Sequence, residues 1–295
     1  MIDDAVARAD RSTTKTGPAF CANESIFSRW NPDEYLREYY TRIEAEEEHT
    51  LRFLVEQSAR VPNASMVLEF GCGPTLHHTL PFARRAAAIH VADLLPQNLE
   101  AIRRWQAKDP HAHDWRPFTR RVLAFEGSTD GLAYETERRE EAIRKLIKRR
   151  LQADARRSNP LGSLSRAYDC VVSCYCADSA TADKQEWRRL MLNIASLIAP
   201  GGLLLIAALR RCKAYTVGMQ SFPSAQIEED DLASVFEQLG LREVGIEAVE
   251  LPNRATHGFE SIVLASATAP GRTTSAVARR SFRTRPAKLQ CTDNA

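Results

Sequence analysis

The sequence lacks several features that would place it in a specialised class of protein. Its seven cysteines are an odd number, and no two are separated by two residues, so neither a Cys-x-x-Cys motif nor a complete disulfide framework is expected. The longest apolar run, residues 203–209, is far shorter than the ~20 residues that span a bilayer, and the polar N-terminus resembles no signal peptide. These absences predict free thiols, a cytoplasmic location and no membrane partner.

Composition and charge describe one folded domain with polar ends. The chain has 295 residues, of which 44% are hydrophobic and 26% are charged, and this composition suits a soluble domain with a core. Residues 271–295 contain six basic residues and one acidic residue, which leaves a net charge of −3 on residues 1–270. Because basic charge concentrates in a Thr/Ser/Arg-rich end, we expect a disordered tail at 269–295 and a disordered leader at 1–26, and nucleic acid is not the expected partner.

The remaining residues, 27–268, show the alternation of a doubly wound α/β sheet. Two helices are expected within 27–60, the first capped by Asn31 and opened by Pro32. Strands are expected at 66–70, 89–92, 147–153, 168–174, 203–209, 242–249 and 261–267, the last two as an antiparallel hairpin. Helices are expected at 76–87, 95–107, 134–146, 184–198 and 228–239, with Pro200-Gly201-Gly202 ending the fourth of these. Residues 108–136 fit poorly and are interpreted as an insertion with a possible strand at 121–125.

The strongest local pattern lies at residues 67–75, where an apolar strand runs into Gly71-x-Gly73. Missing side chains at such a turn let a ligand lie against the backbone and the N-terminus of the next helix. The dinucleotide motif has a third glycine, and Leu76 stands in its place. The pattern therefore predicts a nucleotide-like ligand, with a tight turn that binds nothing as the alternative.

Two acidic residues at strand ends strengthen the ligand interpretation. Asp93 lies 20 residues beyond Gly73, where its carboxylate can accept hydrogen bonds from both hydroxyls of a ribose. Asp154 follows the third strand, where it can accept one from an adenine amine, with a solvated turn acid as the alternative. A dinucleotide and S-adenosylmethionine both fit. The missing third glycine and the acidic Glu69 in the preceding strand favour S-adenosylmethionine.

A metal site is not expected. Cys170, Cys174 and Cys176 cluster at a strand end, but no matching His or Cys pair accompanies them.

Several longer motifs occur together and in order. They are NPDEYLREYY at 31–40, FGCGPT at 70–75, ADLLPQNL at 92–99, Trp105 with DW at 114–115, NPLG at 159–162, DCVVS at 169–173, APGG at 199–202 and YTVG at 215–218. With these motifs, residues 29–267 resemble the methyltransferase family that contains nicotinamide, phenylethanolamine, indolethylamine and thioether methyltransferases. The resemblance implies a Rossmann-like class I fold, a mostly parallel seven-stranded sheet with helices on both faces and an N-terminal helical lid over residues 27–60.

The resemblance also implies a cofactor site for S-adenosylmethionine. Its expected residues are Tyr35, Tyr40, Gly71, Cys72, Gly73, Thr75, Asp93, Asn98, Asp154, Ala155 and Cys174. Within this set, Asp93 and Asn98 would bind the ribose, and Asp154 with the backbone of Ala155 would bind the adenine. The tyrosines of the lid would cover both ligands, and their packing in the core is the alternative.

For the methyl acceptor, the resemblance implies catalytic and substrate-binding residues. Tyr35 and Asp178 are the expected catalytic residues, with Asp178 orienting an amine and taking up its charge. The expected substrate-binding residues are Tyr39, Ala208, Arg211, Tyr215 and Ser224. Ala208 stands where the nicotinamide type has an aspartate, which disfavours nicotinamide. Arg211 stands where the phenylethanolamine type has a glutamate, which indicates either an acceptor with an anionic group or an arginine solvated at the strand end.

The resulting prediction is a monomeric N-methyltransferase of a small molecule that is an amine, a guanidine or an N-heteroaromatic compound. The alternatives are S-methylation of a thiol or thioether and a non-catalytic protein that binds the cofactor. A nicotinamide-dependent oxidoreductase is disfavoured by the missing glycine. A nucleic-acid methyltransferase is disfavoured because the sequence after the fourth strand, residues 173–176, is SCYC rather than an Asp/Asn-Pro-Pro-aromatic motif.

Overall fold

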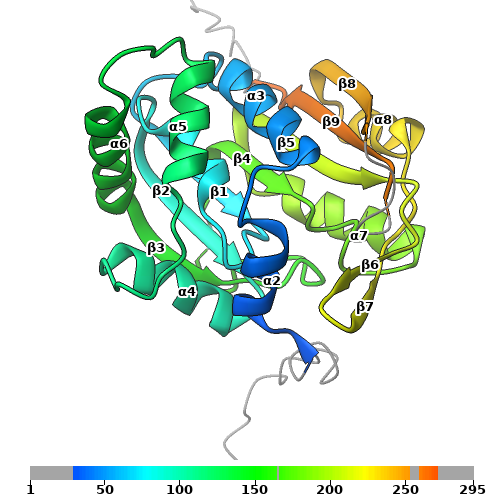
Figure 1. Ribbon diagram of the computed structural model, residues 1–295. Coiled ribbons are helices and arrows are strands. Elements are labelled where there is room, and N and C mark those ends of the chain that lie inside the picture. The colour runs from blue at the N-terminus through cyan, green and yellow to red at the C-terminus, as the bar shows by residue number, and fades with distance from the viewer. Residues whose placement is uncertain (1–28, 165, 253–258, 272–295) are drawn as a thin grey trace, which may run out of the picture.

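The computed structural model describes residues 29–164, 166–252 and 259–271. Within these ranges, a seven-stranded sheet has the order β3-β2-β1-β4-β5-β9-β8, and a separate pair, β6-β7, stands beside it (Figure 1). Pairing is parallel from β3 through β5, and β9 runs antiparallel to both of its neighbours. This arrangement confirms the predicted class I methyltransferase architecture and the antiparallel pairing of the last two strands.

The strands of the main sheet are β1 (Ser65–Phe70), β2 (Ala86–Asp93), β3 (Ile147–Gln152), β4 (Tyr168–Cys174), β5 (Ile198–Arg210), β8 (Arg242–Glu250) and β9 (Ser261–Thr268), and the separate pair is β6 (Ala214–Val217) and β7 (Gln220–Pro223). The helices are α2 (Pro32–Tyr39), α3 (Ala45–Ser58), α4 (Pro96–Gln106), α5 (Arg116–Phe125), α6 (Leu132–Leu146), α7 (Lys184–Ala195) and α8 (Glu229–Gln238), with a 3₁₀ segment η1 at His77–Phe82. No helix of the described chain is long and apolar enough to cross a membrane.

Two hydrophobic cores cover the two faces of the sheet. One contains side chains from α3, η1, α4, α5 and α6, and the other contains side chains from α7 and α8. Residues along a strand alternate between these cores: Ala207 and Leu209 of β5 belong to the first, whereas Ile206 and Ala208 belong to the second. This alternation decides which side chains of β5 can face the site.

The first helix begins as its sequence predicts. The Asn31 side chain accepts hydrogen bonds from the backbone amides of Asp33 and Glu34, at 3.0 and 3.2 Å, and Pro32 occupies the first turn. With α3, this helix supplies the two elements expected over residues 27–60. The predicted leader at 1–26 lies outside the described residues, as does most of the predicted tail at 269–295.

Three local predictions are wrong. The helix expected at 76–87 is the short η1, because Pro81 lies inside it and β2 already begins at Ala86. The possible strand at 121–125 belongs to α5, where Phe118, Val122 and Phe125 recur at helical spacing. Pro200-Gly201-Gly202 does not end a helix, because α7 stops at Ala195 and these residues lie within β5.

Candidate functional site

The glycine turn after β1 requires both of its glycines. Gly71 and Gly73 have φ angles of +74° and +58°, in the region that residues with a side chain rarely adopt. A Cβ atom on Gly71 would overlap the Cys176 side chain, and one on Gly73 would meet only Tyr35, 4.0 Å away. The backbone at Gly73 is therefore open toward the space beneath α2.

Asp93, at the end of β2, organises the neighbouring turn. Its Oδ2 accepts a hydrogen bond from the Gly73 amide at 2.8 Å. Its Oδ1 accepts bonds from the Leu95 amide at 2.8 Å and the Asn98 side chain at 3.0 Å. Burial raises the pKa of Asp93, and these hydrogen bonds oppose the effect. Since a carboxylate oxygen has two acceptor positions, Oδ2 retains one for a ligand hydroxyl.

The third strand end places Asp154 in the same region. Its Oδ1 accepts hydrogen bonds from the Arg156 amide and guanidinium, at 3.0 and 2.9 Å. The carbonyl of the adjacent Ala155 accepts a bond from Asn193 at 2.8 Å. Both residues border the cavity that also reaches Asp93.

A single cavity of about 480 Å³ joins these strand ends. It brings together all of the expected cofactor residues and three of the expected acceptor residues, of which Tyr35 belongs to both sets. Those lining it are Tyr35, Tyr39, Tyr40, Gly71, Cys72, Gly73, Thr75, Asp93, Asn98, Asp154, Ala155, Cys174 and Tyr215. The volume lies in the range of about 300–1,000 Å³ that is usual for small-ligand sites.

Two tyrosines of α2 and Tyr40 at its C-cap line this cavity, and their hydroxyl groups hold the helix in place beside it. The hydroxyls of Tyr35 and Tyr40 lie 3.1 Å apart, and the Tyr39 hydroxyl donates a hydrogen bond to the Thr216 carbonyl in β6 at 2.6 Å. Burial raises the pKa of all three phenols, so they stay neutral donors. The tyrosines pack in or against the hydrophobic core and also line the cavity, and their role as a cover over bound ligands stays a prediction.

Four expected acceptor residues do not reach the cavity wall. Asp178 is 2% exposed, and its Oδ2 accepts bonds from the Leu209 amide and Ser179 hydroxyl, at 2.9 and 3.4 Å. Ala208 faces the opposite core because it alternates with Leu209, which does line the cavity. Ser224 is fully buried away from the cavity.

Arg211 is the fourth. Its guanidinium pairs with the Glu228 carboxylate at 2.7 and 3.0 Å, and its side chain is 60% exposed in a separate surface depression. The structure thus supports the alternative of a solvated arginine at the strand end.

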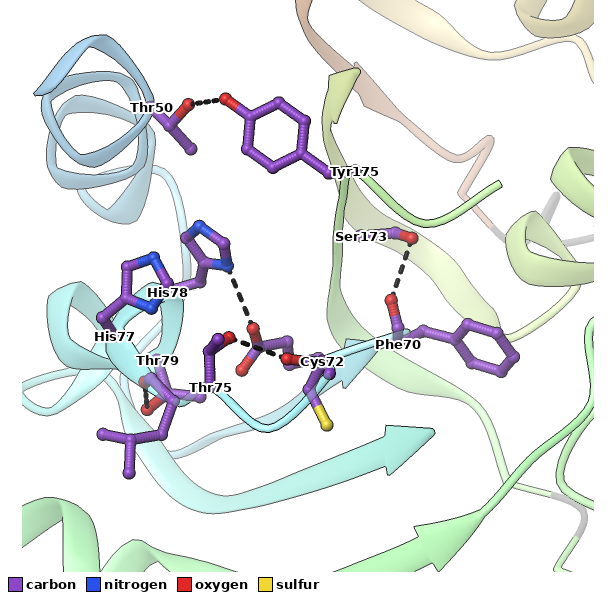
Figure 2. Close-up of polar contacts among 12 residues, drawn as sticks. Thr50, Phe70, Cys72, Thr75, His77, His78, Thr79, Ser173 and Tyr175 are labelled. Atoms are coloured by element: carbon purple, nitrogen blue, oxygen red, sulfur yellow. Dashed lines mark hydrogen bonds and ion pairs between the residues drawn. The ribbon is translucent and has the colours of Figure 1, made fainter. Parts of the chain in front are cut away.

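Sequence reasoning missed a buried polar network beside the glycine turn. Glu47 Oε2 lies 2.9 Å from His77 Nε2 and 3.2 Å from His78 Nε2, and His78 Nδ1 lies 3.1 Å from Glu69 Oε1. Figure 2 shows the two histidines side by side, with the Cys72–Thr75 turn and the Thr50–Tyr175 hydrogen bond nearby. Two consecutive histidines, which only Leu76 separates from FGCGPT, were the available signal.

The network is charged although it is buried. Burial alone would lower the pKa of His78, but Glu47 and Glu69 reverse this effect and raise it to about 10. Burial and the neighbouring His78 lower the pKa of His77 to about 4. The arrangement is therefore a protonated His78 between two glutamates, with a neutral His77.

The same network offers a possible set of metal ligands. One ligand atom each from Glu47, His77 and His78 lies within 4.8 Å of the others. Direct hydrogen bonds already satisfy these atoms, and the absence of a metal stays a prediction.

The comparisons with known proteins agree on one family. A profile described as the NNMT/PNMT/TEMT family matches residues 18–264. Nicotinamide N-methyltransferase of Homo sapiens is 29% identical over 75% of this chain and 85% of its own length. Indolethylamine N-methyltransferase of Mus musculus is 25% identical over 80% and 90%. Phenylethanolamine N-methyltransferase of Homo sapiens is 25% identical over 86% and 94%.

A solved structure supports the fold. Magnesium protoporphyrin IX methyltransferase of Synechocystis PCC 6803, with bound S-adenosylmethionine, superposes with a TM-score of 0.51 at 12% identity, covering 83% of this chain and 94% of the other. At this identity the likeness concerns the architecture alone.

Proposed function

Because the chain belongs to the NNMT/PNMT/TEMT family, we propose that it is an S-adenosylmethionine-dependent N-methyltransferase whose acceptor is a small molecule. The observation that carries the proposal is the convergence of three strand ends on one cavity. The glycine turn after β1, Asp93 after β2 and Asp154 after β3 all line it. Parallel sheets bind nucleotides at this edge, beside the point where the strand order reverses.

The residues present fit this cofactor. The open backbone at Gly73 leaves room for a ligand, and Asp93 Oδ2 retains an acceptor position for a ribose hydroxyl. Asp154 and Ala155 would hold the adenine. Thr75, Cys174 and the lid tyrosines would surround the methionine part.

The main catalytic task of the protein is to position the acceptor nitrogen next to the methyl group of the cofactor. The cofactor supplies a methyl group already activated on a sulfonium, so no strong general base is needed for a neutral nitrogen acceptor. Tyr35 and Tyr215 shape the space next to the glycine turn, and the Tyr39–Thr216 hydrogen bond holds α2 over it and excludes water. Alignment of two bound reactants can supply about 7–11 kcal/mol of the barrier.

In the proposed reaction Asp178 acts through the end of β5 and does not contact the acceptor itself. It lies behind the wall and binds the amide of Leu209, whose side chain lines the cavity. We therefore assign it the positioning of the β5 end rather than contact with the acceptor. Burial raises its pKa to about 6.

The direct test supplies the donor to purified protein with a panel of amines, guanidines, azaheterocycles and thiols. Mass spectrometry then searches for products heavier by one methyl group. A methylated nitrogen supports the proposal, and methylation of thiols alone would identify an S-methyltransferase. No product from any acceptor, with S-adenosylhomocysteine bound, would favour a non-catalytic binding protein.

A further inference from the structure

Charged side chains line the cavity, and most of the acidic and histidine side chains among them have ion-pair or hydrogen-bond partners within the protein. His78 pairs with Glu47 and Glu69, and Asp154 pairs with Arg156. Asp93 accepts three hydrogen bonds, as described above. Glu186 accepts a hydrogen bond from the Thr181 hydroxyl at 2.8 Å. A ligand would compete with these existing partners.

Glu46 is different. It lies in the first turn of α3, is 8% exposed and lines the cavity. Within the described residues, no side chain forms a hydrogen bond or ion pair with its carboxylate, which receives only a hydrogen bond from its own amide. A carboxylate this buried normally has a cationic or multiply hydrogen-bonding partner.

The electrostatic surroundings of Glu46 are acidic. Burial is the main cause that raises its pKa to about 7, and the charges of Glu47 and Glu44 add to the effect. No cation of the described residues is among the causes of this shift. A positive charge placed beside Glu46 would therefore relieve an unfavourable state of the free protein.

Aromatic rings complete the surroundings. Burial is the main cause that raises the pKa values of Tyr35, Tyr39 and Tyr175, and the nearby charge of Glu46 adds to it. These tyrosines line the same cavity, as does Tyr215. Tyrosine faces attract ammonium and guanidinium groups, and the attraction strengthens as water is removed.

We propose that Glu46 binds a positive charge on the methyl acceptor, and that the acceptor is a small molecule carrying an ammonium or guanidinium group. The inference rests on the proposed function and selects among its acceptor classes. It assigns cation recognition to α3, beside the lid, rather than to Asp178 or Arg211. Arg211, the residue that suggested an anionic acceptor, is held by Glu228 outside the cavity.

The test measures binding of matched charged and neutral probes to protein saturated with S-adenosylhomocysteine. Suitable pairs are benzylamine with benzyl alcohol, and benzylguanidine with benzylurea, titrated by calorimetry at pH 8. Three proteins are compared: the unchanged chain, Glu46→Gln, and the control Glu56→Gln, which alters an exposed glutamate of the same helix.

The unchanged protein and Glu56→Gln are expected to bind at least one cation at least about tenfold more tightly than its neutral partner. In Glu46→Gln the preference is expected to fall to about twofold or less, while the affinity for S-adenosylhomocysteine stays unchanged. A preference that persists in Glu46→Gln, or no preference in any pair, would overturn the inference. Failure of the unchanged protein to bind S-adenosylhomocysteine would instead overturn the proposed function, and this inference with it.

Discussion

Glu46 makes the stability of the free protein depend on pH in a predictable direction. Burial raises its pKa from the ordinary value of 4.5 to about 7 in the folded chain, where Glu47 of the same helix, Glu44 at its N-cap and the phenols of Tyr39 and Tyr175 lie nearby. The folded state therefore holds this proton more tightly than the unfolded state does. Below pH 4.5 both states are protonated and the residue has no net effect. As the pH rises from 4.5 through 7, ionisation costs stability, and the loss is complete above the folded pKa.

The magnitude follows from the shift. One pKa unit corresponds to 1.36 kcal/mol, so a shift of this size costs roughly 3 kcal/mol at pH 8. Glu46→Gln keeps the shape of the protonated acid and removes its ionisation. The variant should match the unchanged protein near pH 4 and exceed its unfolding free energy by about 1 kcal/mol at pH 5 and by up to ~3 kcal/mol at pH 8.

Urea unfolding of both proteins between pH 4 and 8 measures this difference. Glu56→Gln is the control, and its difference from the unchanged protein is expected to stay constant because Glu56 is exposed. A difference for Glu46→Gln that is equally constant over the whole range would refute the reasoning, since it would show that the carboxylate has an ordinary pKa in the folded chain.

Other predictions test separate parts of the site. Asp93→Ala should weaken S-adenosylhomocysteine binding by about 1.5–3 kcal/mol in calorimetry, as expected for lost charge-assisted hydrogen bonds, and unchanged affinity would remove the ribose assignment. Gly71→Ala should lower the unfolding free energy by at least ~1 kcal/mol, because the new Cβ meets Cys176 at a positive φ angle, and an unchanged urea midpoint would contradict this geometry. Glu47→Gln should destabilise the fold by about 3 kcal/mol, as for a broken buried ion pair. In the same variant the pKa of His78 should fall in an NMR titration, and an unmoved titration would show that Glu47 is not its partner.

The sheet was predictable because its signals are local. Most main strands contain a short apolar run next to turn residues, whereas β3 and β8 carry many charged residues, and all seven were located from the sequence, with β4 correct at both ends. The errors lie where local signals conflict. Proline interrupts the helical pattern after β1, and the apolar residues of 121–125 match a strand unless Phe118 is counted with them. In contrast, the residues that the sequence motifs predicted to bind the cofactor all line the cavity.

The acceptor side was less predictable, because it depends on which way side chains point and on contacts between distant segments. Aligned positions placed Ala208 and Asp178 in the pocket, but the strand alternation at β5 turns Ala208 away and presents Leu209. The sequence allowed the Arg211 side chain either to enter the acceptor site or to lie in solvent. In the fold it pairs with Glu228, the N-cap residue of α8, and this contact between distant segments is not visible in the sequence. Neither the direction of the Ala208 side chain relative to the cavity nor the partner of Arg211 can be read from the few residues around it.

Glu46 and Glu47 show most clearly why sequence alone could not identify the acceptor wall. They are neighbours in an acid-rich first turn, a position where glutamates are usually solvated and stabilise the helix dipole. In the fold both are buried, yet their pKa values move in opposite directions. Burial would raise the pKa of Glu47, but the histidines of η1 lower it well below its usual range, while Glu46 has no such partner among the described residues and its pKa rises. Both carboxylates line the cavity, but the histidines of η1, 30 residues away, pair with Glu47 and not with Glu46. A single helix thus supplies one acid that is satisfied by the protein and one that is left for a ligand.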